Sequence, residues 1–301
     1  MARNAAWPMG VVAPLLAVTA AMAAFQVGAA FAKQLFPAVG PQGAAALRIV
    51  LGALMLLAVG RPWRAWPGRG SIVPLIGLGI SVAGVILFFY LAIDRLPLGV
   101  AIALQFLGPL SVAVFGSRRA SDLVWAATAA AGVWLLVGVG RQTGALDLLG
   151  IGWALAAAAC WAGYILVGRR VSQGYGVAVA SLSIGVAALV VLPVGLAHAG
   201  PALFAPAILP LALLVALMST AVPFALEFFA MPRMPARTFA VFTSLEPAFG
   251  VLSGLFLLHE RLSPAQVGGV AMVVAAAAAA AWSSAAGAPA AHPDLADAAP
   301  N

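Results

Sequence analysis

The stretch MPARTFAVFTSLEPAFGVLSGLFLLHERLSP, residues Met234 to Pro264, places one carboxylate inside a long apolar segment. The run from about Ala236 to Leu258 is long enough to cross a bilayer as a helix, and Glu246 lies near its middle. An acidic residue at that depth costs roughly 2.5–3.5 kcal/mol, so it must be paired, protonated or open to a water-filled cavity. We therefore predict that Glu246 belongs to a transport site.

The composition of the whole chain agrees with a membrane location. Of the 301 residues, 64% are hydrophobic and 8% are charged, which predicts a polytopic membrane protein in contact with a lipid bilayer. The net charge of +7 comes from basic residues scattered between apolar segments, so we expect no nucleic-acid partner. Because Cys160 is the single cysteine, the sequence offers no intrachain disulfide and no cysteine-based metal site.

Long apolar segments recur along the chain and predict an all-α fold with ten transmembrane helices. The first one also imitates a secretory signal, but it has a counterpart later in the chain, and its removal would leave that counterpart unmatched. Residues 1–10 are expected to form a cytoplasmic N-terminus, and the Ala/Pro-rich residues 285–301 a disordered cytoplasmic tail. The segments lie at residues 11–32, 43–60, 72–92, 98–117, 122–140, 150–168, 177–197, 207–230, 236–258 and 264–284.

Basic residues between these segments predict the orientation, because cytoplasmic loops are enriched in Lys and Arg. With the N-terminus inside, the outer side holds only Lys33, Arg95, Arg141 and Arg261. Both termini are therefore expected in the cytoplasm. The inner side holds a larger set: Arg3, Arg61, Arg64, Arg69, Arg118, Arg119, Arg169, Arg170, Arg233 and Arg237.

The two halves of the chain repeat one another. A constant offset aligns Pro97 with Pro235 and Pro109 with Pro247. Five predicted helices are thus followed by five more, and an odd number makes the second set enter the membrane from the opposite side. We predict two inverted five-helix repeats, 11–140 and 150–284, joined by a periplasmic linker, 141–149. In such folds the substrate site lies between the repeats near the midplane, which favours the fourth and ninth helices.

Polar residues and prolines coincide in those two helices. The spacing of Thr243, Glu246 and Pro247 places them on one face of a helix, and Gln105 and Pro109 are their counterparts. Each proline removes one hydrogen bond and frees a carbonyl about one turn earlier, which favours a ligand site. Alternatively, the prolines only kink packed helices.

Two further charged residues fall within predicted helices. Glu227 shares a stripe with Pro223 and is a candidate for titrating a proton or binding an ammonium group. Its alternative is a simple ion pair with Arg233 or Arg237. Arg48 is expected either to extend toward the outer surface or to hold a substrate carboxylate.

A few other polar and aromatic residues have weaker signals for anchoring, capping or lining a cavity. Lys33 closes the first segment and is expected to anchor it at the interface. Ser263 is expected to cap the last helix together with Gln266. We also expect that Gln26, Tyr90, Trp161 and Tyr164 could line a cavity, although aromatic residues in membrane helices more often pack.

The sequence excludes several chemistries. His259 and Glu260 do not complete a zinc-protease motif, because Ser263 stands where the second histidine would be required. A Walker loop is also missing, so ATP is not the expected energy source and no cofactor is expected. The chain is therefore not expected to be an enzyme. A membrane-embedded enzyme or scaffold remains a remote alternative.

The sequence as a whole resembles the EamA branch of the drug/metabolite transporter superfamily over about residues 10 to 284. The repeated halves, the Glu246-Pro247 pair and the HERLSPAQ corner carry the resemblance. The runs AKQLFPAVGPQGAAALR, LPLGVAIALQFLGPL, FGSRRASDLVW, CWAGYILVGRR and RMPARTFAVFTSLEPA are similar to those of bacterial inner-membrane exporters of threonine and homoserine. The resemblance implies efflux of these and other small amino acids, driven by a proton gradient.

Two positions depart from that pattern. An acidic residue stands in the exporters where this chain has Gln105, and a glycine commonly stands where it has His259. The substrate set and the proton stoichiometry therefore stay open, and a broad drug or metabolite exporter of the same superfamily is the alternative. The oligomeric state is open as well.

Overall fold

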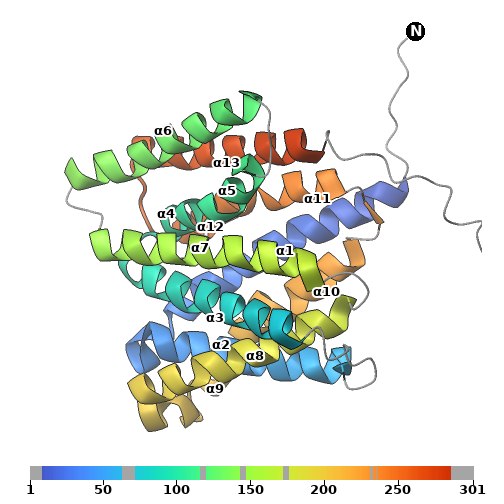
Figure 1. Ribbon diagram of the computed structural model, residues 1–301. Helices are drawn as coiled ribbons and strands as arrows, with labels where there is room; N and C mark the ends of the chain where they lie inside the picture. Colours follow the sequence, from blue (N-terminus) through green and yellow to red (C-terminus); the bar gives the residue numbers. More distant parts are fainter. Residues whose placement is uncertain are drawn as a thin grey trace, which may run out of the picture.

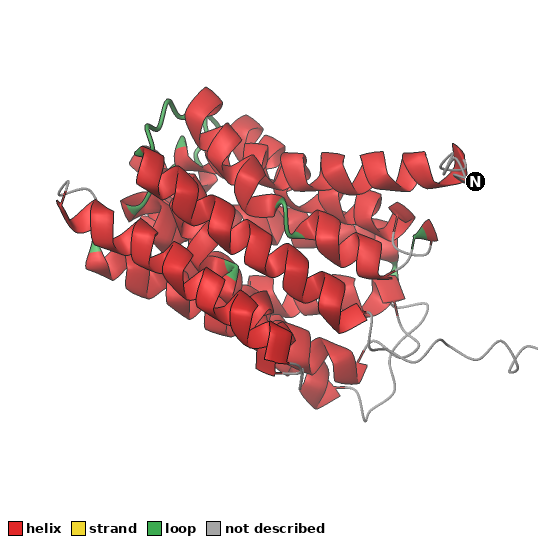
Figure 2. Ribbon diagram, turned by 90° about the horizontal axis from the view of Figure 1, so that it is seen from above, coloured by secondary structure: helices red, strands yellow, loops and turns green. Residues whose placement is uncertain are grey.

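The computed structural model describes residues 9–62, 72–115, 120–142, 147–171, 176–230, 233–234 and 236–285. The regular elements within these ranges are all helices (Figure 2). A helix satisfies its backbone N–H and C=O groups within one segment, as a backbone surrounded by lipid requires. The all-α class predicted from composition is therefore confirmed. The expected tail, residues 285–301, lies almost wholly outside the described residues, as does most of the expected N-terminal segment.

The helices follow one another with short connections (Figure 1). In chain order they are α1 (Met9–Lys33), α2 (Phe36–Gly60), α3 (Ile72–Arg95), α4 (Leu98–Gln105), α5 (Leu107–Phe115), α6 (Ala120–Gln142), α7 (Leu148–Val171), α8 (Gly176–Ala199), the 3-10 helix Gly200–Phe204, α9 (Leu209–Ala216), the π-helical turn Leu217–Ala221, α10 (Val222–Ala230), α11 (Ala236–Thr243), α12 (Glu246–Leu257) and α13 (Pro264–Ala285).

Within the described ranges, six helices are long and apolar enough to cross a membrane. The shorter apolar helices are Leu98–Val112, Leu123–Leu136, Val241–Leu257 and Pro264–Ala280. Every predicted segment thus contains helix, but the count of ten membrane crossings stays a prediction. The six long helices span Val12–Lys33, Phe36–Gly60, Ile72–Arg95, Leu148–Gly168, Ser181–Phe204 and Leu209–Glu227.

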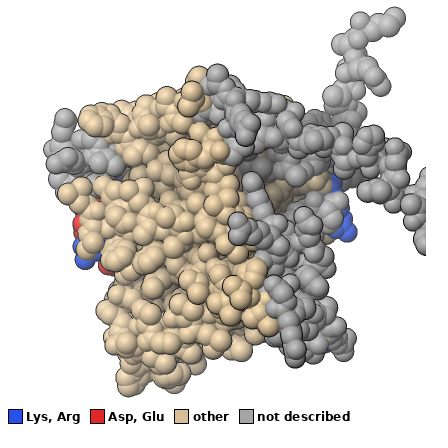
Figure 3. Space-filling view, viewed as in Figure 1, with Lys and Arg blue, Asp and Glu red and all other residues tan. Residues whose placement is uncertain are grey.

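The surface of the bundle suits a hydrocarbon environment. In Figure 3 the coloured charged atoms lie at the two ends of the molecule, and the described surface between them carries none in that view. Large apolar side chains are exposed on the outside, among them Val59, Phe115 and Trp134. Such a surface would be unfavourable in water but matches lipid tails.

Two helices are interrupted at corresponding places in the two halves. The regular α-helical pattern is interrupted at Phe106, between α4 and α5, and again at Ser244 and Leu245, between α11 and α12, while the backbone of Phe106 and Leu245 keeps right-handed helical dihedral angles. Each interruption lies just before a proline, Pro109 or Pro247, which cannot donate a backbone hydrogen bond to the preceding turn. Both interruptions therefore lie within about one turn before their prolines, where the sequence predicts a freed carbonyl.

The helix α2 begins earlier than predicted. It starts at Phe36 rather than near residue 43, and its first turns are bent where Gly40 adopts a φ of 68° directly before Pro41. Gly40 is itself not helical, so α2 consists of a short first piece joined to the main helix across a kink. The predicted start near residue 43 is therefore close to the start of the main helix, and with the first piece included Arg48 stands midway along α2.

Close packing joins α4 to α12 and so brings the two interrupted segments together. A Cβ atom added to Gly99 of α4 would lie 3.0 Å from Val251 Cα and 3.1 Å from its backbone nitrogen. An added Cβ on Gly250 would lie 3.6 Å from Gly99 Cα. Small residues thus allow the two helix backbones to approach closely. Other tightly packed pairs are α3 with α7, α2 with α8, α6 with α13 and α1 with α10.

Helix caps fix the connections. The backbone N–H of Ser263 donates to Gln266 Oε1 at 2.8 Å, and the N–H of Gln266 donates to Ser263 Oγ at 3.2 Å, so the predicted capping box is confirmed. Before α7, Asp147 accepts a hydrogen bond of 2.8 Å from the backbone N–H of Leu149 and pairs with Arg95. The hydrogen bond from the Arg95 side chain, followed by that from Leu149, lowers the pKa of Asp147 below its ordinary value.

Replacing Asp147 with asparagine should lower the melting temperature slightly near pH 7, and the difference should shrink as the pH falls. A carboxyl group whose pKa is lowered by folding stabilises the protein above its unfolded pKa of about 3.9. That stabilisation is lost as the pH drops through the folded value. The pair is exposed, so the effect is small. Melting curves of both proteins in detergent between about pH 7 and pH 3 test this, and a difference that grows on acidification would contradict it.

Candidate functional site

Glu246 lies where the interrupted helix resumes. It is the first residue of α12, and its Oε1 accepts a hydrogen bond of 2.8 Å from Gln26 Nε2 of α1. The N-terminal end of a helix carries partial positive charge, which favours a carboxylate there. Thr243 ends α11, so Thr243 and Glu246 lie on two helices separated by a break. The shared face of Thr243 and Glu246 therefore stays a prediction, because only a two-residue interruption within the apolar stretch Val241–Leu257 separates them.

Arg48 lies deep in the bundle. It stands midway along α2, its Nη2 donates to the backbone carbonyl of Ser219 at 3.0 Å, and its guanidinium carbon lies 5.6 Å from the centre of the Tyr90 ring. Because of these contacts, the expectation that Arg48 extends toward the outer surface was wrong. Arg48 also lies close enough to Glu246 for their charges to interact. The second interpretation, a site for a substrate carboxylate, remains as a prediction.

The π-helical turn Leu217–Ala221 explains why the Ser219 carbonyl is available. A π turn carries one extra residue in a helix and displaces the regular pattern of backbone hydrogen bonds, often at functional sites. Pro223 follows directly in α10 and cannot donate its own backbone hydrogen bond. Ser219 and Thr220 are both buried in this turn. The turn thus presents the Ser219 carbonyl to the guanidinium of Arg48.

Several buried polar atoms around Arg48 have no hydrogen-bond partner in the described structure. Ser219 and Tyr90 are 0% exposed, and Gln26 is 3% exposed. An unpaired buried polar atom costs about 1–3 kcal/mol, so such atoms in one place require an explanation. The atoms concerned are Gln26 Oε1, Arg48 Nε, Tyr90 Oη and Ser219 Oγ.

Glu227 extends the polar cluster along α10. Its charge interacts with that of Glu246 and with Tyr164 of α7. Arg233 donates instead to the carbonyl of Phe229 at 2.7 Å and lies 4.2 Å from the centre of the Phe229 ring. The proposed ion pair between Glu227 and Arg233 is therefore not formed among the described contacts. The side chain of Arg237, the other candidate partner, lies outside the described part.

Gln105 and Trp161 both lie beside Phe106, at the interruption between α4 and α5. Gln105 ends α4 and is 6% exposed, so it is buried beside the interruption at Phe106. The ring of Phe106 meets Trp161 edge to face, with 5.2 Å between centroids, which gives Trp161 a packing role. Glu246 receives its hydrogen bond from Gln26 rather than from Gln105.

Sequence reasoning missed the contribution of Glu260. Its Oε1 pairs with Lys33 Nζ at 2.7 Å, and its Oε2 accepts a hydrogen bond of 2.7 Å from the backbone N–H of Leu98. The sequence predicts that Lys33 anchors α1 at the interface, and it places Glu260 only in the HERLSPAQ corner, without a partner. The signal that could have linked them is that both residues follow the end of an apolar segment on the same predicted side of the membrane.

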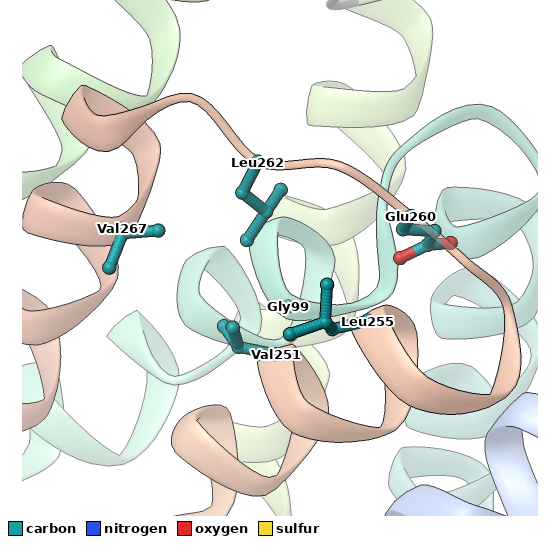
Figure 4. Close-up of a pocket in the computed structure, with 6 residues that line it drawn as sticks. All are labelled: Gly99, Val251, Leu255, Glu260, Leu262 and Val267. Atoms are coloured by element: carbon teal, nitrogen blue, oxygen red, sulfur yellow. The ribbon is translucent and has the colours of Figure 1, made fainter.

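A cavity of about 150 Å³ lies beside Glu260, between α4, α12 and the start of α13 (Figure 4). In the close-up, Glu260 and Val267 lie on opposite sides of the space, and Leu262 covers it from the connecting segment. The lining is otherwise apolar, and it does not include Glu246 or Arg48. The polar cluster around Arg48 is therefore a separate feature.

Known proteins resemble this chain along most of its length. The profile of the EamA-like transporter family matches residues 148–282. The threonine/homoserine exporter RhtA of Escherichia coli (strain K12) is 44% identical over 262 residues, which are 87% of this chain and 89% of that protein. RhtA of Salmonella typhimurium (strain SL1344) is 43% identical over the same shares. A solved crystal structure with 24% identity superposes with a TM-score of 0.56 over 90% of this chain and 97% of that one, so the fold is shared. The chain belongs to the EamA-like transporter family.

Proposed function

We propose that this transporter exports threonine, homoserine and similar small amino acids by alternating access, in exchange for protons. Membership of a transporter family means that the chain is not an enzyme. The names of its relatives support the substrates, and the half-buried carboxylates Glu246 and Glu227, both within apolar segments, support proton exchange. The single observation that carries the proposal is the hydrogen bond from Gln26 to Glu246 at the helix interruption. It occurs in a chain that is 44% identical to a threonine/homoserine exporter.

The proposed architecture is ten membrane helices in two inverted repeats, 11–140 and 150–284, with 141–149 as a periplasmic linker. The corresponding breaks at Phe106 and Ser244 support the repeat, because discontinuous helices in equivalent positions are typical of inverted-repeat transporters. The basic residues support cytoplasmic termini, with 1–10 and 285–301 inside, in a bacterial inner membrane. The ion pairs of Arg95 and Lys33 would then face outward.

In the proposed cycle Glu246 binds either a proton or the ammonium group of the substrate. Gln26 holds the carboxylate in place through its hydrogen bond. Glu227 releases or accepts the proton toward the cytoplasm, since it lies near the inner end of its helix by the predicted orientation. Gln105 and Thr243 are proposed to hydrogen-bond the substrate. Further residues are proposed to line the path or to interrupt the helices: Tyr164, Trp161, Pro109, Pro223 and Pro247.

Efflux from cells tests the role of Glu246. A strain that lacks its own exporters is loaded with labelled threonine, and efflux is followed with and without an imposed proton gradient. Glu246→Gln should lower gradient-driven efflux at least roughly tenfold, the expected effect of losing one charge-assisted hydrogen bond. Asp94→Asn, which changes an exposed carboxylate at the end of α3, is the matched control and should export normally.

Unchanged gradient-driven efflux in Glu246→Gln would contradict this role. Homoserine efflux should fall in parallel with threonine efflux. If expression instead gives tolerance to lipophilic cations and no efflux of either amino acid, the chain is a broad drug exporter.

A further inference from the structure

Arg48 is a half-buried cation that forms no ion pair with a carboxylate in the described part of the chain. It stands at the middle of a membrane helix, where a charged residue costs several kcal/mol unless it is compensated. A guanidinium has five N–H donors, and a single backbone carbonyl, that of Ser219, accepts from it. Its Nε is buried and unpaired. The guanidinium therefore keeps hydrogen-bonding capacity for an anion.

The groups around the guanidinium suit a carboxylate in particular. Tyr90 Oη and Ser219 Oγ are fully buried hydroxyls that lie near one another, with Tyr90 also near the guanidinium, and neither forms a hydrogen bond of regular geometry in the described structure. Each can donate to an oxygen atom. The planar guanidinium can hold both oxygens of a carboxylate with parallel hydrogen bonds. Tyr90 also presents its ring to Arg48, which fixes the orientation of the cation. Guanidinium and hydroxyls come from three separate parts of the chain, α2, α3 and the π turn.

Glu246 supplies the opposite charge in the same cluster. Its charge interacts with that of Arg48, and it accepts a hydrogen bond from Gln26, so an anionic group and a cationic group lie in one cluster. The Oε1 atom of Gln26 is itself buried and unpaired. An α-amino acid carries an ammonium and a carboxylate on one carbon, so it would complement both charges at once. An amine without a carboxylate would complement only one.

We infer that Arg48, Tyr90 and Ser219 form the binding site for the α-carboxylate of the transported amino acid, and that the Ser219 carbonyl occupies the guanidinium when no substrate is bound. This inference rests on the proposed amino-acid export. Entry of the carboxylate releases the Ser219 carbonyl, which has no α-helical donor at Pro223 and can bond within its own helix only in the π pattern, to the N–H of Phe224. Substrate binding is thereby linked to the shape of the helix formed by α9, the π turn and α10.

The test uses the full chain in lipid nanodiscs with three ligands: L-threonine, L-threonine amide and threoninol. The amide and the alcohol keep the ammonium and the side chain but lack the carboxylate. Binding is measured by the shift in melting temperature across a concentration series. The wild-type protein should bind L-threonine roughly 10- to 100-fold more tightly than either analogue, the range expected for hydrogen bonds to a charged group.

Variants separate the contributions of the cluster. Arg48→Met should remove the preference for the carboxylate, and Arg48→Lys should reduce it, because lysine keeps the charge and loses the planar fork. Tyr90→Phe removes one hydroxyl and should lower the affinity for L-threonine roughly tenfold, while the affinities for the two analogues stay unchanged. Arg95→Lys, a conservative change in an exposed ion pair, is the control and should retain the wild-type preference. Melting without ligand shows that each variant is folded.

The outcomes are distinct. Equal binding of L-threonine and its amide by the wild-type protein overturns the carboxylate site but leaves export intact. A Tyr90→Phe protein that is folded and keeps the full preference removes the hydroxyl from the site. Failure of the wild-type protein both to bind and to export any amino acid overturns the proposed function, and the inference with it.

Discussion

Replacing Glu260 with alanine should lower the free energy of unfolding by about 3 kcal/mol, because one partly buried carboxylate joins three parts of the chain. It accepts 2.7 Å hydrogen bonds from Lys33 at the end of α1 and from the backbone N–H of Leu98 at the start of α4. The Lys33 and Glu260 side chains are 23% and 15% exposed, so water would only partly replace the lost carboxylate. Melting of the purified protein in detergent measures the loss.

Two milder changes distinguish the ion pair from the backbone hydrogen bond. Lys33→Met leaves the bond to Leu98, and Glu260→Gln keeps an oxygen for Leu98 but removes the charge. The double variant with both changes then gives the coupling between the two side chains. Each single change should be less destabilising than Glu260→Ala. Asp94→Asn, at an exposed position at the end of α3, provides the control. A Glu260→Ala protein with the same melting temperature as the wild-type protein would contradict the structural role of Glu260.

The helices and their breaks could be predicted from the sequence because their causes are local. Apolar length determines a membrane helix, and Pro109 and Pro247 remove backbone hydrogen bonds wherever they stand. The same holds for the cap made by Ser263 and Gln266, which are three residues apart. These features need no knowledge of which helices are neighbours.

The partners of the buried charges could not be predicted, because they depend on tertiary packing. Gln26 and Glu246 are 220 residues apart in the chain, and no local pattern pairs them. Arg48 was placed too near the surface because the Gly40-Pro41 bend hid the first turns of its helix. The contact between Arg48 and Ser219 depends on a π turn, and no local sequence pattern indicates the extra residue that such a turn adds to a helix.

Gly28→Leu should prevent the chain from folding, because Gly28 is where α1 touches the backbone of the π turn. A Cβ atom added there would lie 2.9 Å from the backbone nitrogen of Ser219 and 3.1 Å from the carbonyl carbon of Met218. It would lie closer still to Ser219 Oγ. Backbone atoms cannot rotate aside as a long side chain can, so α1 and the turn would have to separate. Even Gly28→Ala should cost about 1–3 kcal/mol.

Gly152 of α7 provides a matched control, because it is also a helical glycine and no atom lies within 4 Å of its added Cβ. Gly152→Ala should be neutral or stabilising by up to about 1 kcal/mol, since alanine favours helix over glycine. The yield of monodisperse protein and its melting temperature compare the two positions. Gly28→Ala should also impair export by more than its loss of folded protein explains, because the separated turn carries the carbonyl that binds Arg48. Equal yields of Gly28→Leu and Gly152→Leu would show that α1 does not require glycine at this contact.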